Sequence, residues 1–491
     1  MKNYIFSRVV KSIVAILAVV SIVIVMLYTM VPRNKVFEGD DGYKKLSGDA
    51  RTTYTYSRYE NLGYLDYQQL PEMCRNSSED YEACMVVGSD TQNAVIADYE
   101  NRGYTIERLR SGEAFAYRNY NAFELIWNFY SKLIVIDTPN AVVDENNPNL
   151  ERGYYIGTAP NGMPAVMCSG CQYKYQLYFN SSFPFIHTNA IRFNFGISYP
   201  TNDGLPTLQV ISQGQGSQQP FEQEFPTGVV EKSAINQYTC QYKPLLDNID
   251  SRRFDDNYAS CLSNYESPSM INTSYIFGII ALVIAYAFAI PAGISMARNK
   301  DKALDRAGIV LINFLIAVPS LALIFFVRTL GSNFGMPDRF PILGFKDPRS
   351  YIIPIIILAL LQIPNLMTWT RRYMLDQSNA DYAKFAKAKG LSQKEIFMNH
   401  ILKNAIIPIV NGIPSSIILC ISGALLTESA FAIPGMGKML PDSIKTCNNN
   451  MVINLVFIFT TLSIFAILAG DILMTIVDPR IQLTTKGGKK K

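Results

Sequence analysis

Six long apolar runs, separated by polar segments, dominate the hydrophobic pattern of this 491-residue chain. Each run has about 18–26 residues, and at about 1.5 Å per residue a helix of that length crosses a hydrocarbon core of about 30 Å. The runs cover residues 9–30, 276–297, 309–327, 352–369, 405–426 and 452–477. Helices that are apolar on every side suit a membrane better than a globular core, so we predict six transmembrane helices.

The first run has one alternative, the apolar part of a cleaved signal peptide, because Lys2, Arg8 and Lys11 give it a basic start. Such apolar parts usually have about 7–15 residues, whereas this run has 22. No small-x-small cleavage site precedes Pro32. We therefore expect residues 1–31 to form a retained membrane helix.

The long polar segment between the first two runs differs in charge from the rest of the chain. Residues 31–273 contain 29 acidic and 19 basic side chains, against 11 acidic and 25 basic side chains elsewhere. A segment of this length needs its own hydrophobic core. Its sequence is partly helical in pattern over residues 107–128, and β-formers alternate or cluster over residues 174–179, 190–198 and 207–212. We predict an α+β domain over residues 32–273.

Basic residues set the expected orientation, because positively charged loops stay in the cytoplasm. With the N-terminus inside, 19 of the 25 basic residues outside the acidic segment lie on the cytoplasmic side. The prediction is a polytopic α-helical protein of the cell membrane, surrounded by lipid, with both termini cytoplasmic. Its α+β domain is extracellular and inserted between helices 1 and 2, a five-helix core comes next over residues 274–480, and a basic tail covers residues 481–491.

Most of the cysteines lie in the predicted extracellular domain. They are Cys74, Cys84, Cys168, Cys171, Cys240 and Cys261. An even number in an oxidising compartment favours disulfides. Short separations make the three sequential pairings the simplest, although the spacing leaves the connectivity open. A zinc site at Cys168 and Cys171 would need a second pair of ligands, and only His187 lies near in sequence, so we expect no metal.

The cytoplasmic loop after the fourth run has the pattern of two short helices around a glycine. Residues 381–389 favour a helix, and Gly390 supplies the left-handed position that ends it. Ser392 and Glu395 form a capping box that starts a second helix. We predict a hairpin over residues 380–404, either as a structural amphipathic loop or as a surface that a soluble partner pushes on. Its small side chains would let it enter a groove on that partner: Ala383, Ala386 and Ala388.

A family resemblance rests on this hairpin and on two later segments of the chain. The segment Ala386-Lys-Ala-Lys-Gly390, followed by Ile396, His400 and Asn404-Ala405, resembles the EAA signature of ABC importer permeases in the form that peptide permeases use. The match continues through Glu428-Ser-Ala-Phe431 and Pro434-Gly-Met-Gly437, and then through Asp478-Pro-Arg480. Lys384 replaces the leading Glu of the signature. The long outer segment resembles the Gram-positive Ami-type oligopeptide permeases.

This resemblance implies a role and a set of partners. The hairpin would couple the chain to an ATPase through Asp381, Ala383, Ala386, Gly390, Ile396 and His400, although His400 alone also fits a packed structural histidine. The implied partners are a second permease subunit, two ATP-binding cassette ATPases, an extracellular peptide-binding lipoprotein and the peptide substrate, with no nucleic acid. The implied mechanism is alternating access.

The chain by itself has no pattern for ATP hydrolysis. Gly435-Met-Gly437-Lys438 lacks the first glycine of a phosphate-binding loop, and a histidine-based relay is not expected from a chain with only two histidines. We expect no enzymatic activity and no cofactor on this chain. ATP and magnesium would bind to the partner ATPases.

Polar residues inside the apolar runs are candidates for a transport path, because lipid disfavours them. They are Asn313, Gln362, Asn365, Asn411, Ser415, Ser416 and Asn454, with expected helix breaks at Pro319, Pro364, Pro408 and Pro414. Each polar side chain has the alternative of bonding a neighbouring helix. Asp471 is expected to pair with Arg480 or Lys486 near the inner surface rather than to relay protons.

Together these features predict the permease subunit of an ATP-driven oligopeptide importer. A dipeptide or nickel ABC permease is the nearest alternative, since it would share the hairpin and differ in cargo. A secondary transporter would need an ionisable relay in the membrane, for which Asp471 is the one candidate. A peptide-sensing receptor would need neither six helices nor the hairpin.

Overall fold

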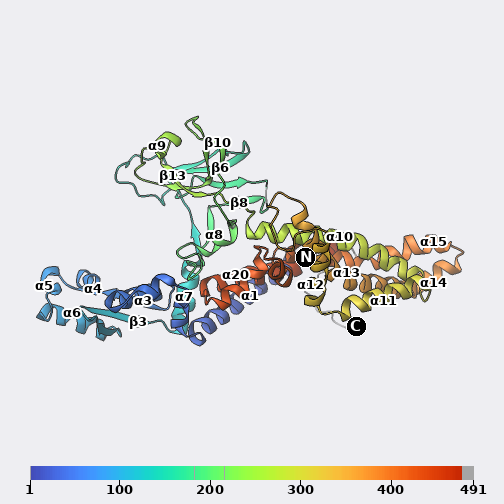
Figure 1. The fold of residues 1–491 in the computed structure, drawn as a ribbon, viewed down its shortest axis with the longest axis horizontal. Helices are drawn as coiled ribbons and strands as arrows, with labels where there is room; N and C mark the ends of the chain where they lie inside the picture. The colour runs from blue at the N-terminus through green and yellow to red at the C-terminus, as the bar shows by residue number, and fades with distance from the viewer. Residues whose placement is uncertain (1, 182, 215, 478–491) are drawn as a thin grey trace.

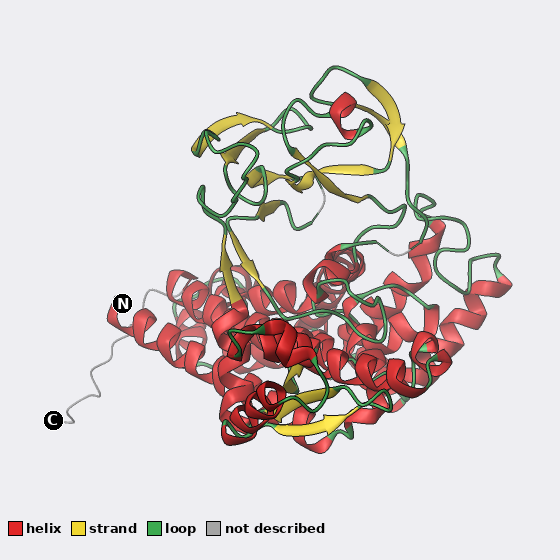
Figure 2. Cartoon of the chain, turned by 90° about the vertical axis from the view of Figure 1, so that its left-hand side faces the viewer, coloured by secondary structure: helices red, strands yellow, loops and turns green. Residues whose placement is uncertain are grey.

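The computed structural model describes residues 2–181, 183–214 and 216–477, and the chain is elongated (Figure 1). Apolar helices from residues 2–30 and 270–477 form a bundle, here called the helical core. The segment between them contributes an α/β lobe (residues 33–119), which lies at one end of the long axis, and a β lobe (residues 153–263). Figure 2 shows most strands gathered on one side of the helices. The inserted segment therefore contains both helices and strands, as predicted.

Four helices of the core are long and apolar enough to cross a membrane. They are α1 (Lys2–Met30), α10 (Met270–Arg298), α13 (Arg349–Ser378) and α20 (Asn449–Val477). Two more candidates are bent pairs: α11 (Ala303–Ala317) meets α12 (Ser320–Asn333) at 103°, and the helical segment Gln393–Ala405 meets α17 (Ile407–Cys420) at 42°. The described chain thus has four crossing helices by length and composition, or up to six if each bent pair is one span.

Proline accounts for the sharper bend. The expected break at Pro319 is confirmed: this residue divides the apolar run 309–327 into α11 and α12, and Val318 and Pro319 have ψ of 124° and 132°. Proline lacks an N–H and forces the preceding residue out of the helical region. Pro408 lies in the first turn of α17, where no N–H is needed. The predicted breaks at Pro364 and Pro414 are wrong, since α13 and α17 continue through both.

The helices α10 and α13 pack closely through small side chains. One face of α10 carries a buried small residue at every fourth position: Ala281, Ala285, Ala289 and Gly293. Such a stripe lets two helix backbones approach in a membrane. A Cβ on Gly293 would lie 2.7 Å from Cβ of Thr370 and 3.0 Å from the carbonyl oxygen of Met367, both on α13. The contact therefore depends on these positions staying small.

The α/β lobe is built on a three-stranded antiparallel sheet in the order β1–β3–β2. Its elements are η1 (Arg33–Phe37), α2 (Asp41–Lys45), α3 (Gly48–Asn61), β1 (Leu65–Gln69), α4 (Leu70–Ser77), α5 (Tyr81–Met85), α6 (Asp90–Asn101), β2 (Thr105–Arg108) and β3 (Ala114–Asn119). The next helix, α7 (Ala122–Leu133), lies along α1, where the hydroxyl of Tyr130 donates to the carbonyl of Leu17 at 2.9 Å. This helix connects the lobe to the helical core.

The β lobe consists of short antiparallel sheets. Four strands pair in the order β5 (Gly153–Thr158), β6 (Pro164–Ser169), β7 (Tyr175–Phe179) and β8 (Ile186–Thr188), and two hairpins are β10 (Phe221–Glu224) with β11 (Val230–Ser233) and β12 (Ile235–Tyr242) with β13 (Tyr258–Ser263). The short α9 (Asp250–Arg253) precedes β13, and a ribbon of β4 (Ile134–Ile136) with β9 (Ile191–Phe193) leads into the lobe. Strand β7 confirms the predicted strand at 174–179, and β9 covers part of that at 190–198.

One secondary-structure prediction in this segment is wrong, and one is confirmed only in part. Residues 207–212 form the helix α8 (Thr207–Ser212) instead of a strand, because Val210 and Ile211 pack on one side against Met270 of the helical core. Residues 107–128 become helical only from α7 onward, since β3 occupies residues 114–119. In both cases the contact partner is distant in sequence and decides the local conformation.

Three disulfides lie in the inserted segment. Cys74 is bonded to Cys84, Cys168 to Cys171 and Cys240 to Cys261. Each of these cysteines is bonded to the one nearest to it in the sequence. This is the simplest of the pairings that the spacing left open. The first staples α4 to α5, and the other two lie in the β lobe.

Three successive asparagines, Asn448–Asn450, join the helical core to the inserted segment at the start of α20. The amide of Asn448 donates to the hydroxyls of Ser198 and Thr201 at 2.8 and 3.0 Å. The amides of the next two donate to the hydroxyl of Tyr64 at 2.6 Å and to the carbonyl of Ile197 at 2.9 Å. All three side chains are buried, so the loss of any one bond leaves an unpaired polar group.

We expect Gly293→Val to separate α10 from α13 and to destabilise the helical core by about 1–3 kcal/mol, because the added methyl groups have no room. The midpoint of thermal unfolding in detergent measures this loss. Gly412→Val is the matched control, since a Cβ on Gly412 of α17 meets nothing within 4 Å. Equal midpoints for the two variants would contradict the close contact.

Candidate functional site

The hairpin at residues 381–405 projects from the helical core at the end opposite the α/β lobe (Figure 1). It consists of α14 (Asp381–Ala388), α15 (Gln393–Glu395), the π-helix η2 (Ile396–Ile401) and α16 (Leu402–Ala405). Gly390 has φ of +81°, and the Ser392 hydroxyl and Glu395 carboxylate cap each other's backbone N–H at 3.3 and 2.9 Å. The predicted helix, glycine turn and capping box are confirmed.

Three of the six predicted coupling residues face the protein itself. Ala383, Ala386 and Ile396 are buried in a cluster with Met374 of α13, against which Ile294 of α10 also packs. The idea that the small alanines face a partner's groove is therefore wrong for Ala383 and Ala386. Their size instead lets α14 lie close to the inner ends of α10 and α13, so that the hairpin and these two helices form one packed unit.

The outward side of the hairpin carries different residues. Asp381 is exposed and bridges to Lys384 at 3.0 Å, Gly390 is exposed, and His400 is half-buried. Phe385 is 62% exposed, and its ring lies 4.6 Å from the ammonium of Lys389. The structure turns Phe385 away from the cluster that buries Ala386. Leu391 and Met398 are exposed as well, so this surface offers apolar side chains to another protein.

An ion pair ties α11 to α13 next to the hairpin. Asp305 is fully buried and receives two hydrogen bonds from the guanidinium of Arg371, at 2.6 and 2.8 Å. A third bond comes from the backbone N–H of Asp301 at 3.0 Å. A bidentate pair of this kind fixes orientation as well as distance. The pair thus fixes the start of α11 against α13, the helix on which the hairpin packs.

A cavity of about 220 Å³ lies between α10, α13, α17 and α18 (Leu425–Phe431). Two of the predicted path residues, Gln362 and Ser416, line it. The hydroxyl of Ser416 lies 3.3 Å from that of Tyr286. Ser274, Thr427 and Glu428 also line this cavity, and sequence reasoning had not assigned a path role to any of them.

Glu428 is the centre of a buried network beside this cavity. Its carboxylate accepts hydrogen bonds from the hydroxyl of Ser274 at 2.9 Å and from the backbone N–H groups of Ala424 and Lys438 at 3.0 and 2.9 Å. Gly435, which precedes α19 (Met436–Lys445), has no room for a Cβ because the carboxylate of Glu428 occupies that space. The glycines of the Pro-Gly-Met-Gly motif are therefore explained by close approach to a buried acid.

The other predicted path residues are not brought together. Ser415 donates to the carbonyl of Ala466 at 3.0 Å, and Asn411 lies against Gly470, so both face α20. Asn454 is fully buried within the described chain. Asn313 and Asn365 are instead exposed on α11 and α13.

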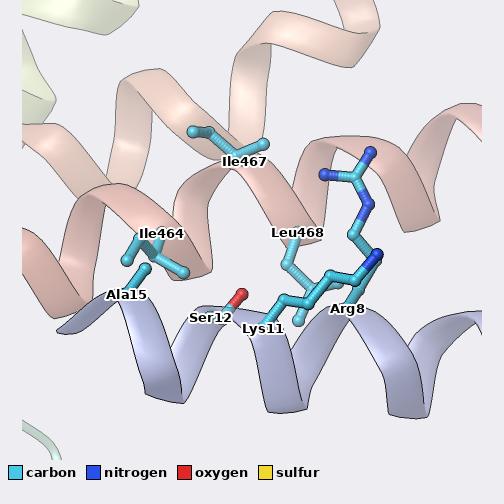
Figure 3. Close-up of a pocket in the computed structure, with 7 residues that line it drawn as sticks. All are labelled: Arg8, Lys11, Ser12, Ala15, Ile464, Ile467 and Leu468. Carbon is cyan, nitrogen blue, oxygen red and sulfur yellow. The ribbon is translucent and has the colours of Figure 1, made fainter. Parts of the chain in front are cut away.

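Asp471 pairs with Arg8, the two charged atoms lying 3.3 Å apart. This contact joins α20 to α1 beside a groove of about 460 Å³. In Figure 3, Arg8 and Lys11 of α1 lie near Leu468 of α20, and Ala15 lies near Ile464. The expected partners Arg480 and Lys486, like the Asp478-Pro-Arg480 part of the motif, lie outside the described residues. Sequence reasoning missed Arg8 because the two helices come from opposite ends of the chain.

Nothing in the described ranges forms a group of three or more histidine, cysteine or acidic side chains placed to hold a metal ion. The arrangement has the features of a helical membrane protein with a surface for a partner at one end and a polar cavity between its helices. It contains no set of residues that we assign to covalent chemistry.

Comparisons with known proteins agree with this arrangement. The sequence profile of a family described as "Binding-protein-dependent transport system inner membrane component" matches residues 289–483. The chain is 46% identical to the oligopeptide transport system permease protein AmiC of Streptococcus pneumoniae, over 100% of both chains. It is 28% identical to the dipeptide transport system permease protein DppB of Bacillus subtilis and 31% identical to DppB of Lactococcus lactis, over 44% and 42% of this chain and 69% and 67% of those proteins.

We expect Ser274→Ala to weaken the network around Glu428, because the serine hydroxyl also accepts the backbone N–H of Met436 at 2.9 Å. Leaving these buried groups without that partner costs about 1–3 kcal/mol, which would lower the midpoint of thermal unfolding in detergent. Ser422→Ala is the control, since that hydroxyl bonds only the carbonyl of Leu419 in its own turn. An unchanged midpoint for Ser274→Ala would show that the network adds little to stability.

Proposed function

The chain belongs to the family of oligopeptide permeases of binding-protein-dependent transport systems, and from this premise we propose that it forms half of the membrane path through which an ATP-driven importer moves oligopeptides into the cell. The observation that carries the proposal is the similarity to an oligopeptide permease over both whole chains, lobes included. The dipeptide permeases match less than half of this chain, as does a second oligopeptide permease, so the choice of oligopeptides as cargo rests on the whole-chain match.

The proposed complex has a second permease subunit, two ATPases that hold ATP and magnesium, and an extracellular peptide-binding lipoprotein. The two bent helix pairs each count as one span, which gives six. Both termini and the hairpin lie in the cytoplasm, and the lobes lie outside. The opposite positions of hairpin and lobes support this orientation (Figure 1), as do the disulfides, which persist in oxidising compartments.

The hairpin is the proposed contact with an ATPase. Its outward surface offers Phe385, Leu391 and Met398 together with the exposed Asp381. Its inward side is packed against α13 and α10, so a displacement of the hairpin moves both helices. Packed elements transmit such a displacement because they deform little. In this way closure of the ATPases would switch the core between outward-open and inward-open states.

The proposed path lies on one face of α13, closed by the second permease. Gln362, Asn365 and Trp369 share that face by helical spacing. Asn365 and Trp369 are exposed in this single chain, and a polar group in a membrane tends to face protein or water. Neutral amides suit a path for peptides of varied sequence, because they carry no fixed charge to retain one cargo.

We expect Gly390→Val to reduce uptake of a labelled oligopeptide at least tenfold while the protein remains in the membrane. The left-handed backbone at Gly390 disfavours any side chain by about 1–2 kcal/mol and a β-branched one most, so the hairpin turn would change shape. Gly103→Val is the matched control, since Gly103 has φ of +86° and equal space in the α/β lobe. Full uptake by the Gly390 variant would argue against coupling through this turn.

Orientation is tested by thiol labelling in a background where Cys420 and Cys447 are replaced by serine. A membrane-impermeant maleimide added to intact cells should label Ser111→Cys in the α/β lobe and leave Ser392→Cys in the hairpin unlabelled. Both serines are exposed, so access depends on the side of the membrane. Labelling of the hairpin cysteine from outside would reverse the proposed orientation and remove the basis for an ATPase contact.

A further inference from the structure

A cavity of about 570 Å³ lies where the β lobe meets α8 and the first turn of α10. One wall is a stack of three rings, with the centre of Tyr178 at 5.1 Å from that of His187 and 4.6 Å from that of Tyr238. Residues of α8 and of the linker between β13 and α10 also line it. Its volume falls within the range of about 300–1,000 Å³ typical of ligand sites.

The polar groups of the lining suit a peptide backbone. Amides and hydroxyls make up nearly all of its polar side chains. The amides are those of Asn180, Gln209, Gln213, Gln219, Asn236, Asn264 and Asn272. An amide both donates and accepts hydrogen bonds, as a peptide unit does, and therefore suits backbone groups of any sequence.

The charged side chains of the lining make it negative. Glu266 is its one carboxylate, and neither lysine nor arginine occurs among the lining residues. Burial lowers the pKa of His187 below its usual range, so this imidazole is neutral at pH 7. The site therefore favours a ligand with a positive group at one end. An oligopeptide with a free amino terminus has that group, a backbone for the amides and side chains for the rings.

We propose that this cavity binds the amino-terminal segment of an incoming oligopeptide, with its ammonium group at Glu266, before the peptide enters the helical core. The inference rests on the proposed function for the identity of the cargo. Position supports it: Asn272 lines this cavity, and Ser274, two residues further along α10, lines the cavity between the membrane helices. A peptide held here lies at the start of a helix that borders the proposed path.

The test measures binding of the peptide Ala-Ala-Phe-Ala-Ala to the full chain in lipid nanodiscs, without partner subunits. The same peptide with an acetylated amino terminus is the second probe. We expect acetylation to weaken binding about tenfold, as loss of a charge-assisted hydrogen bond does. Glu266→Gln should weaken the free-amine peptide to the level of the acetylated one and leave the acetylated peptide unchanged. Glu222→Gln, an exposed site on β10, should bind both as the unaltered chain does.

A second pair of variants tests the cavity itself. Ser212 is exposed at the end of α8 and lines the cavity, so Ser212→Trp fills the space without disturbing a packed core. This variant should lose both peptides. Ser251→Trp, at an exposed position on α9 outside the lining, should bind both normally.

Uptake by cells that carry the complete transport complex separates this inference from the proposed function. If the unaltered chain supports uptake but binds neither peptide, or if Glu266→Gln and Ser212→Trp bind both as before, the cavity is no peptide site and the permease function stands. If uptake never depends on the chain, the proposed function fails. Even then, the cavity would be supported as a peptide site if the four variants changed peptide binding as described above.

Discussion

Close packing of α10 against α13 is the contact on which the rest of the helical core depends. The stripe of Ala281, Ala285, Ala289 and Gly293 brings the two backbones together, and the hairpin packs against the C-terminal ends of the same two helices. Because lipid gives little hydrophobic drive for helices to associate, this fit must come from shape. The packed pair connects the hairpin surface to the cavity around Gln362.

A second set of contacts fixes the inserted segment. The asparagines at the start of α20 bond both to the α/β lobe, through Tyr64, and to the approach to the β lobe, through Ile197 and Ser198. A helix near the C-terminus thus holds a segment that comes directly after the first helix of the chain. These buried bonds act only when every partner is in place, so they favour one position of the lobes relative to the core.

The cavity beside the β lobe and the cavity around Gln362 differ in the chemistry of their linings. The first has amides, rings and one carboxylate, which under our proposal lets it distinguish one end of a peptide from the other. The second has the hydroxyl of Ser416 and the amide of Gln362, and Glu428 there accepts hydrogen bonds from backbone and serine donors. An acid whose oxygens are occupied in this way holds a loop in place.

The sequence by itself determined the features that depend on local pattern. Apolar runs of membrane length, the capping box at Ser392 and the turn at Gly390 all follow from spacing along the chain, whereas spacing left the cysteine pairing open. Tertiary structure alone decided the rest. It turned Phe385 outward and Ala386 inward, made residues 207–212 a helix, paired Asp471 with Arg8 and gathered Glu428 with Ser274. The physical reason is that each of these outcomes depends on a partner far away in the sequence, and no periodicity within one segment records what will pack against it.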